Sequence, residues 1–377
     1  MSPRFLPIAA VALSVGALLA RPLLAGTDLT LKEAAHGRFL IGAAINDRIV
    51  QGEEPAAAHI VEREFNAISP ENCLKWAVVH PEPGRYDFTR SDAYVDFGVK
   101  HGLFIVGHTL MWHYQTPAWV FYNADGSLKS RAQVLAELRD HIRTVVGRYK
   151  GRIKGWDVVN EAFDDSGKLR TDRPWYKILG EDGILAAFKA AHEADPKAEL
   201  YYNDFSLWLP AKRRAVIALV EKIRAAGLRI DGVGMQEHYL MSGPSPQMVG
   251  QAIDAFANAK IPVMVTELDI SVLPRPNHYT GADLGQLQAK QAEFDPYVNG
   301  LPVRMENALA DRYAAMFAVY RAHAEDIKRV TFWGVSDGDS WLNNWPIRGR
   351  HDYPLLFDRH FRPKPAFFAV MKALDHP

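Results

Sequence analysis

The chain has 377 residues, of which 48% are hydrophobic and 23% are charged, the composition of an ordinary globular protein. Two domains would be usual for this length, but α/β barrels of about 250 residues or more form one unit. The 44 basic and 44 acidic side chains cancel, which removes any electrostatic reason to expect nucleic acid or an acidic membrane surface as partner and favours a neutral ligand.

The first 25 residues are typical of a signal peptide for export. A positively charged start that includes Arg4 is followed by an apolar run over residues 5–20 and by a small residue, Ala25. The sequence therefore predicts a secreted or periplasmic protein whose catalytic domain spans residues 26–377. The alternative is an N-terminal membrane anchor, for which so short a run is marginal.

The single cysteine, Cys73, cannot form an intramolecular disulfide. A nucleophilic role beside a histidine is conceivable, but a lone cysteine is more often a small buried hydrophobe. We therefore expect Cys73 to be buried and unreactive.

Eight short apolar segments alternate along the chain with longer segments of helical periodicity. Segments that are short and continuously apolar suit strands buried on both faces, as a parallel sheet requires. The predicted strands are residues 39–44, 67–69, 104–108, 155–160, 200–203, 232–236, 262–266 and 330–333.

Helices are predicted between these strands. The clearest begins after Ser130, a good N-cap with Gln133 three residues later, and runs to Tyr149. Another covers residues 211–226 and stops at Gly227, a natural C-terminal cap. The others lie near residues 92–100, 183–193, 248–259, 306–324 and 364–374.

Eight strands that alternate with helices predict a single (β/α)8 TIM barrel. A doubly wound open sheet is the alternative, but it usually has fewer strands and a glycine-rich first turn that this sequence lacks. The barrel also predicts where function lies, because active sites of TIM barrels lie at the carboxyl ends of the strands.

Polar or aromatic side chains follow seven of the eight predicted strands. Any one of them could be an ordinary turn or cap residue, but seven strand ends that converge on one face indicate an active site. These residues are Glu71, Asn72, His108, Asn160, Glu161, Asn203, Asp204, Gln236, His238, Glu267, Asp269, Trp333 and Asp337.

Two carboxylates, Glu161 and Glu267, follow strands that are otherwise apolar, the fourth and the seventh. Charged groups are costly in such places unless they are paired or used in catalysis. Since these strands face one another across the barrel mouth, the carboxylates can share a cleft, as glycoside hydrolysis requires. The alternative is that each carboxylate forms a separate ion pair with an arginine or lysine of the barrel.

Aromatic residues in or beside the strand-to-helix loops favour a sugar as substrate. Flat apolar faces next to hydrogen-bonding groups bind pyranose rings well, although core packing is as common for any single tryptophan. The tryptophans in question are Trp76, Trp112, Trp119, Trp333 and Trp341.

Other catalytic chemistries lack their motifs. His108 and His113 are five residues apart, which is off one helical face, and the chain has no His-Glu-x-x-His and no cysteine pair. A Walker loop, a Gly-x-Gly-x-x-Gly turn after the first strand and a Gly-x-Ser-x-Gly elbow are also missing. The sequence therefore predicts neither a metal nor a cofactor.

Seven ordered motifs that span the chain from about Gly37 to Leu374 resemble glycoside hydrolase family 10, whose members are mainly endo-β-1,4-xylanases. The motifs are SPENCLKW (69–76), GHTLMWH (107–113), WDVVNEAF (156–163), YYNDF (201–205), GVGMQEHY (232–239), VTELDIS (265–271) and FWGVSDGDSW (332–341).

This resemblance implies hydrolysis of internal β-1,4-xylosidic bonds by a double displacement that retains the anomeric configuration. Glu161 matches the general acid/base and Glu267 the nucleophile. Asn160 matches the residue that binds the sugar 2-hydroxyl. His238 matches the histidine that hydrogen-bonds the nucleophile, and Asp269 the carboxylate that orients that histidine.

The resemblance also implies a substrate site for xylan and xylooligosaccharides, with no obligate protein partner. Lys75 and the last two tryptophans would crowd the C5 position, where xylose lacks the hydroxymethyl group of glucose. Another retaining β-1,4-glycanase, such as a cellulase, and a catalytically silent xylan-binding barrel remain the alternatives. The implied substrate-binding residues are Glu71, Asn72, Lys75, His108, Trp112, Gln115, Asn203, Gln236, Trp333 and Trp341.

Two residues depart from the family pattern, and both affect the expected leaving-group side. Phe205 stands where the family usually has tyrosine, and Glu237 stands where a small residue is common. In addition, residues 272–301 form a long polar segment with proline and glycine, a pattern often found in lids. We expect Tyr279 or Tyr297 to line the cleft.

Overall fold

The structure, a computed structural model, describes residues 29–275 and 292–375. The predicted signal peptide at residues 1–25 and Tyr279 therefore lie outside the described residues. Within the described ranges, none of the helices combines the length and the apolar character needed to cross a membrane.

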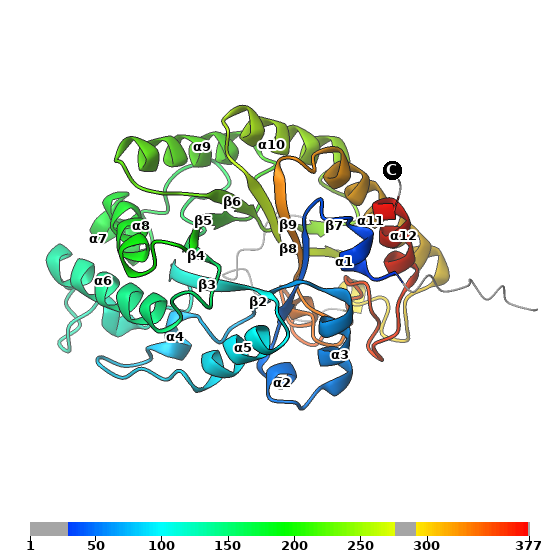
Figure 1. Cartoon of the computed structure of the whole chain (residues 1–377), viewed down its shortest axis with the longest axis horizontal. Coiled ribbons are helices and arrows are strands. Elements are labelled where there is room, and N and C mark those ends of the chain that lie inside the picture. Colours follow the sequence, from blue (N-terminus) through cyan, green and yellow to red (C-terminus); the bar gives the residue numbers. More distant parts are fainter. Residues whose placement is uncertain (1–28, 276–291, 376–377) are drawn as a thin grey trace, which may run out of the picture.

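Eight parallel strands close into a barrel (Figure 1). The first strand pairs with both the second and the last, and β6 pairs with both β5 and β8, so the sheet closes on itself. This closure confirms the (β/α)8 prediction and excludes the open sheet. The barrel strands are β1 (Leu40–Ile45), β2 (Ala67–Pro70), β3 (Phe104–Trp112), β4 (Gly155–Asn160), β5 (Glu199–Asp204), β6 (Gly232–Met235), β8 (Val263–Ser271) and β9 (Ile327–Phe332).

Strands β3 and β8 extend beyond their predicted ends. A short strand that was not predicted, β7 (His238–Leu240), pairs with the extension of β8 and places His238 opposite Asp269. The extension of β3 pairs with β4, where Trp112 lies opposite Asn160. Glu267 and Asp269 therefore lie within a strand and not in the loop after it, which fixes their backbones.

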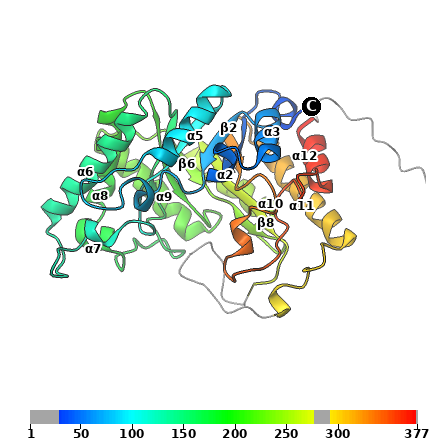
Figure 2. The ribbon, with the colours of Figure 1, turned by 90° about the horizontal axis from the view of Figure 1, so that it is seen from below.

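The helices form a ring outside the barrel (Figures 1 and 2). All the predicted helices are present, and α3 and the short helices were not predicted. The helices are α1 (Leu31–Ala34), α2 (Asp47–Val50), α3 (Pro55–Glu64), α4 (Trp76–Val79), α5 (Thr89–Lys100), α6 (Arg131–Arg148), α7 (Pro174–Leu179), α8 (Asp182–Ala194), α9 (Pro210–Ala225), α10 (Pro246–Asn258), α11 (Val303–Ala322) and α12 (Pro365–Asp375), with 3-10 turns η1 (Ala118–Val120), η2 (Ala292–Phe294) and η3 (Trp341–Asn343).

The predicted caps of two helices are confirmed. At the start of α6, the Ser130 amide donates to Gln133 Oε1 at 2.9 Å, and the Gln133 amide donates to Ser130 Oγ at 3.4 Å. This reciprocal pair satisfies donors that a helix start leaves free. After α9, Gly227 adopts a φ of 71°, the left-handed conformation that commonly ends a helix.

The last helix, α12, packs against α1 and α11, so it closes the ring beside the first strand (Figures 1 and 2). The long loop between β9 and α12 is therefore fixed at both ends. This loop carries Trp333 and Trp341 toward the carboxyl ends of the strands.

Candidate active site

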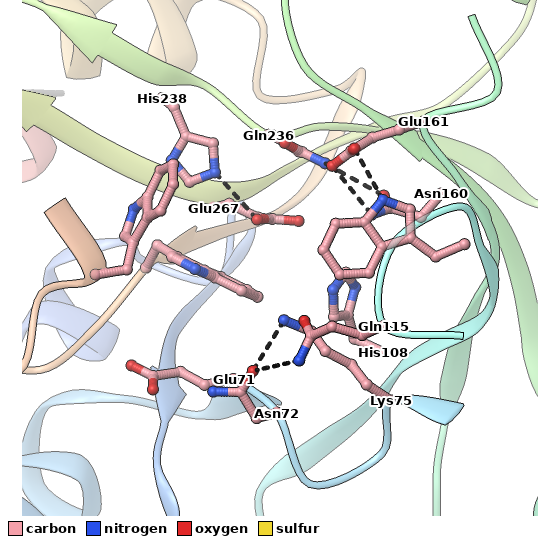
Figure 3. Close-up of a pocket in the computed structure, with 13 residues that line it drawn as sticks. Glu71, Asn72, Lys75, His108, Gln115, Asn160, Glu161, Gln236, His238 and Glu267 are labelled. Atoms are coloured by element: carbon pink, nitrogen blue, oxygen red, sulfur yellow. Dashed lines mark hydrogen bonds and ion pairs between the residues drawn. The ribbon is translucent and has the colours of Figure 1, made fainter. Parts of the chain in front are cut away.

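A pocket with a volume of about 170 Å³ lies at the carboxyl ends of the strands (Figure 3). Every residue that lines it was predicted from the sequence as a catalytic or substrate-binding residue. The lining residues are Glu71, Asn72, Lys75, His108, Trp112, Gln115, Asn160, Glu161, Gln236, His238, Glu267, Trp333 and Trp341.

Glu161 follows β4 with a left-handed backbone, at a φ of 57°. Such a conformation is strained for a residue with a side chain, and such strain tends to occur at functional sites. Here the backbone is fixed by its neighbours: the Glu161 amide donates to the Asn203 carbonyl at 2.9 Å, and the next amide, that of Ala162, donates to the Tyr202 hydroxyl at 3.0 Å. The turn therefore holds the Glu161 side chain in the pocket.

The Glu161 carboxyl accepts three hydrogen bonds (Figure 3). Trp112 Nε1 donates to Oε2 at 2.8 Å, while Gln236 Nε2 and Asn160 Nδ2 donate to Oε1 at 3.0 Å and 3.2 Å. Burial and the negative charge of Asp204 raise its pKa to about 7, against the hydrogen bonds, which favour the ionised form. Glu161 can therefore hold a proton near neutral pH.

Glu267, unlike Glu161, is held in its ionised form, because its pKa is lowered. Its Oε1 accepts from Asn203 Nδ2 at 2.7 Å, and its Oε2 lies 3.1 Å from His238 Nε2. Burial opposes ionisation, but the hydrogen bond from His238 and the positive charge of that ring are among the effects that outweigh it and lower the pKa of Glu267. Two buried carboxyls in one pocket thus have opposite tendencies to bind a proton.

His238 connects Glu267 to Asp269, as predicted. Its Nδ1 lies 3.0 Å from Asp269 Oδ2. Burial favours the neutral ring, yet the charge of Asp269 and the hydrogen bonds to both carboxylates raise the pKa of His238 to about 9. Asp269 lies behind His238 and not on the pocket wall, and Trp341 Nε1 also donates to it, at 2.8 Å.

Asn203 was predicted to bind substrate but lies one layer deeper. Its amide donates to Asn160 Oδ1 at 3.0 Å as well as to Glu267, and its oxygen accepts from Thr266 Oγ1 at 2.7 Å. Asn203 therefore orients a carboxylate and an amide of the pocket, and it is not itself among the lining residues.

Gly234 on β6 makes room for Asn203. A Cβ atom at Gly234 would lie 2.2 Å from Asn203 Oδ1. Only glycine leaves space for the Asn203 amide in this position.

Lys75, Asn72 and Gln115 form one side of the pocket (Figure 3). Lys75 Nζ donates to Asn72 Oδ1 at 3.1 Å and lies 4.9 Å from the centre of the Trp112 ring. Burial lowers the pKa of Lys75, although the charges of Glu267 and Glu71 act in the opposite direction. The side therefore offers a cation and two amides to a ligand.

His108 is held by a buried aspartate, Asp157, whose Oδ2 lies 2.9 Å from His108 Nδ1. The Trp333 ring meets His108 edge-on, with 5.5 Å between ring centres. The Trp341 ring stacks on the Trp345 ring, with 4.7 Å between ring centres. The Arg275 guanidinium lies 4.8 Å from the centre of the Trp345 ring.

The sequence assigned no catalytic or binding role to three residues that support the pocket: Asp157, Asp204, which it placed only among the polar strand ends, and Trp345. The first two lie in or next to quoted motifs, but nothing in a linear motif separates a supporting carboxylate from a lining one. Trp345 lies beyond the last motif, so its only signal is that another tryptophan, Trp341, lies four residues before it.

Two of the candidate tryptophans, Trp76 and Trp119, pack against one another. Trp76 is buried, and its ring stacks on His141 with 3.6 Å between ring centres. Trp119 meets Trp76 edge-on and donates to the Pro81 carbonyl at 3.0 Å. Neither residue is among those that line the pocket, so the core-packing alternative holds for Trp76, and the half-buried Trp119 packs beside it.

The two departures from the family pattern lie outside the pocket wall. Phe205 is buried, and the Lys212 ammonium lies 3.6 Å from its ring centre. Glu237 is also buried and accepts a hydrogen bond from Tyr320 on α11. Tyr297 is not among the lining residues either, since it lies beside a separate hollow next to Val272.

Cys73 is 3% exposed, as expected, and burial raises the pKa of its thiol, which disfavours the reactive thiolate. Among the described residues, no group of three or more histidine, cysteine, aspartate or glutamate side chains could hold a metal ion.

The chain resembles proteins of one family over most of its length. Residues 30–373 match the family described as Glycosyl hydrolase family 10. Endo-1,4-beta-xylanase A of Xylanibacter ruminicola is 43% identical over 346 residues, which cover 92% of this chain and 94% of that protein.

Solved structures are also similar to this chain over most of its length. A GH10 endoxylanase from a sugarcane soil metagenome is 44% identical, with a TM-score of 0.87 over 91% of this chain and 99% of that one. A mutant structure in complex with xylotriose is 34% identical, with a TM-score of 0.80 over 91% and 99% of the two chains. This chain belongs to glycosyl hydrolase family 10.

Proposed function

We propose that this chain is a retaining endo-1,4-β-xylanase, with Glu161 as general acid/base and Glu267 as nucleophile. The observation that carries the proposal is the opposite protonation of two buried carboxyls in one pocket, with a pKa of about 7 for Glu161 and a lowered pKa for Glu267. A double displacement requires a proton donor and an ionised nucleophile at the same time. The xylanase relatives support the choice of substrate.

In the first step, the Glu267 carboxylate attacks the anomeric carbon and the bond to the leaving oxygen breaks. Glu161 gives its proton to that oxygen, so the leaving chain departs as an alcohol. The hydrogen bonds from His238 and Asn203 keep Glu267 ionised before the attack.

In the second step, water attacks the glycosyl ester and Glu161 takes the water proton, which frees Glu267. The charge of Glu267 is one of the causes that raise the pKa of Glu161. Formation of the ester removes that charge, so the pKa of Glu161 falls and its change from acid to base is favoured.

The pocket wall supports xylose rather than glucose at the reacting position. Lys75, Trp333 and Trp341 are bulky side chains of the wall, and we assign them the crowding of C5 that a hydroxymethyl group would meet. The family neighbour in complex with xylotriose supports xylooligosaccharides as ligands.

Comparative hydrolysis tests the substrate. We expect release of reducing ends from xylan well above that from carboxymethylcellulose or mannan, and early xylooligosaccharide products with the β configuration by NMR. Faster cleavage of cellulose or mannan would assign another glycanase activity, an initial α product would reject retention, and binding of xylan without cleavage would leave only a binding protein.

Paired variants test the two roles. Glu267→Ala should lower kcat by several orders of magnitude on every substrate, because the nucleophile is lost. Glu161→Ala should do so on xylan but spare the first step with a dinitrophenyl xylobioside, because that leaving group departs without a proton. Equal losses of kcat/KM, which reports the first step, on both substrates in Glu161→Ala would contradict the assignment.

We also propose export of the chain, supported by the charged start at Arg4 and the apolar residues 5–20. N-terminal sequencing of the protein recovered outside the cytoplasm should find a start near residue 26. A full-length chain that stays in the membrane fraction would favour the anchor.

A further inference from the structure

Glu237 lies between two residues of the pocket wall yet points away from the pocket. Gln236 and His238, on either side of it, both line the pocket (Figure 3). Glu237 itself is 3% exposed and has a left-handed backbone, with a φ of 64°. This residue is therefore the point at which the chain turns from β6 into β7.

The Glu237 side chain reaches the helix layer outside the barrel. The Tyr320 hydroxyl, on α11, donates to Glu237 Oε2. Three groups face this carboxyl: Tyr239 on β7, and Tyr320 and Arg312 on α11. Burial outweighs their opposing effect and raises the pKa of Glu237 to about 7.

The backbone around Glu237 is also attached to the nucleophile strand. The Glu267 amide donates to the Gln236 carbonyl at 2.9 Å, and β7 places His238 opposite Asp269 on β8. A movement of residue 237 would therefore move His238 against both Glu267 and Asp269. A left-handed conformation at a residue other than glycine persists only when its surroundings hold it.

We infer that Glu237 is a positioning residue of the hydrolytic reaction: its carboxyl, anchored to Tyr320, fixes the left-handed turn that holds His238 against Glu267. The inference rests on the proposed function, since it concerns the histidine that keeps the nucleophile ionised. Glu237 touches no substrate and acts through His238.

The test compares three variants with the wild-type chain. Glu237→Ala removes the anchor, Glu237→Gln keeps a hydrogen-bond acceptor for Tyr320, and Tyr320→Phe removes the donor. Tyr313→Phe is the matched control, because its hydroxyl lies on the same helix but bonds the Pro354 carbonyl instead.

The first readout is the acidic limb of kcat/KM on a dinitrophenyl xylobioside, which reports the pKa of Glu267 without the acid role of Glu161. In Glu237→Ala, we expect this limb to move up by roughly one pH unit, a tenfold change in the ionisation constant. Tyr320→Phe should move it in the same direction. Glu237→Gln and Tyr313→Phe should leave it in place.

The second readout needs no activity: the NMR signal of the His238 Nδ1 proton that faces Asp269. It should shift in Glu237→Ala and Tyr320→Phe and stay unchanged in Glu237→Gln and Tyr313→Phe. If the anchor variants lower the melting temperature but leave both readouts as in wild type, Glu237 is merely structural and the inference is overturned. If the wild-type chain does not hydrolyse the xylobioside, the proposed function fails, and the NMR signal still decides whether Glu237 positions His238.

Discussion

Two carboxyl groups of opposite protonation set the pH range in which the pocket can react. Glu267 must be ionised, and its pKa is lowered below the usual 4.5. Glu161 must be protonated, and its pKa is about 7. We expect kcat/KM on xylooligosaccharides to fall below the pKa of Glu267, where the nucleophile gains a proton, and to fall again above about pH 7, where Glu161 loses one.

Measurement of kcat/KM from pH 3 to 9 checks this bell-shaped profile. The same profile on a dinitrophenyl xylobioside should lose its alkaline limb only, since that leaving group needs no acid. An alkaline limb that persists on this glycoside would mean that a group other than Glu161 sets it.

A second residue-scale prediction concerns Gly234. A methyl group here would collide with the Asn203 amide, which donates to both Glu267 and Asn160. Gly234→Ala should therefore displace Asn203, raise the pKa of Glu267 and lower kcat, by about tenfold for the loss of one such hydrogen bond to a charged group.

Gly147→Ala is the control for this change, because a methyl group at Gly147 on α6 meets nothing within 4 Å. It should leave kcat unchanged and favour the helix slightly, since alanine has the higher helix propensity. If kcat of Gly234→Ala matched that of the control, Asn203 would not contribute through this contact.

The loop between β9 and α12 is held by a buried ion pair whose two residues are not among those that line the pocket. Lys364 Nζ lies 2.8 Å from Asp337 Oδ2, and both side chains are buried. The same nitrogen donates to the carbonyls of Tyr353 and Leu355. Asp337 in turn connects to Asn343 at the end of η3, the turn that begins at Trp341.

We expect Lys364→Met to destabilise the chain by about 3–5 kcal/mol, because it leaves the Asp337 carboxylate buried without its cation. It should also raise KM more than it lowers kcat, since Trp341 belongs to the substrate wall. Urea unfolding and steady-state kinetics measure the two effects. Lys372→Met, an exposed change on α12, should stay within about 0.5 kcal/mol of wild type.

How far the sequence predicts the elements depends on how local their signals are. The strand β4 can be predicted because its residues form a short apolar run, and the helix α6 can be predicted because its cap lies within a few positions. The three residues of β7 and the four of α4 are too short to carry a period. β7 and the extension of β8 arise from pairing with one another, a contact between segments about 30 residues apart that no local pattern contains.

The same limit applies to the candidate site. The residues that line the pocket are found in the motifs, so the sequence predicts the wall. The orientation of Glu237 away from the pocket, by contrast, depends on a left-handed φ and on a tyrosine 83 residues later. The sequence left open whether Trp76 packs in the core for a similar reason, because its partner His141 comes from another helix.

At the scale of the whole molecule, buried histidines make stability depend on pH. His141, on α6, is fully buried, stacks on Trp76, and its Nδ1 lies 3.4 Å from Nδ1 of His80. Burial, followed by the proximity of His80, lowers the pKa of His141 well below 6.5. The folded chain therefore holds this ring neutral at pH values where the unfolded chain protonates it.

The sign of the effect follows from that difference. Above about pH 6.5 the ring is neutral in both states and its contribution to stability is intact, whereas at lower pH protonation favours the unfolded chain. His141 alone then removes about 1.4 kcal/mol of unfolding free energy for each pH unit below that value, until the folded chain also binds the proton. We expect His141→Phe, which keeps an aromatic ring beside Trp76, to lose this slope between pH 6.5 and 5. It should also be less stable than wild type at pH 7, because His80 loses its partner.

Urea unfolding at several pH values measures the slope, with His192→Phe, an exposed change on α8, as the control that should keep it. The informative result is how the unfolding free energies of the two chains change with pH. His141→Phe should be less stable than wild type at neutral pH, and the difference between them should shrink in acid. If the two unfolding free energies stayed parallel from pH 7 to pH 5, the acid sensitivity of the fold would have to come from the buried carboxylates, because the His80 and His141 pair would then bind protons equally in both states.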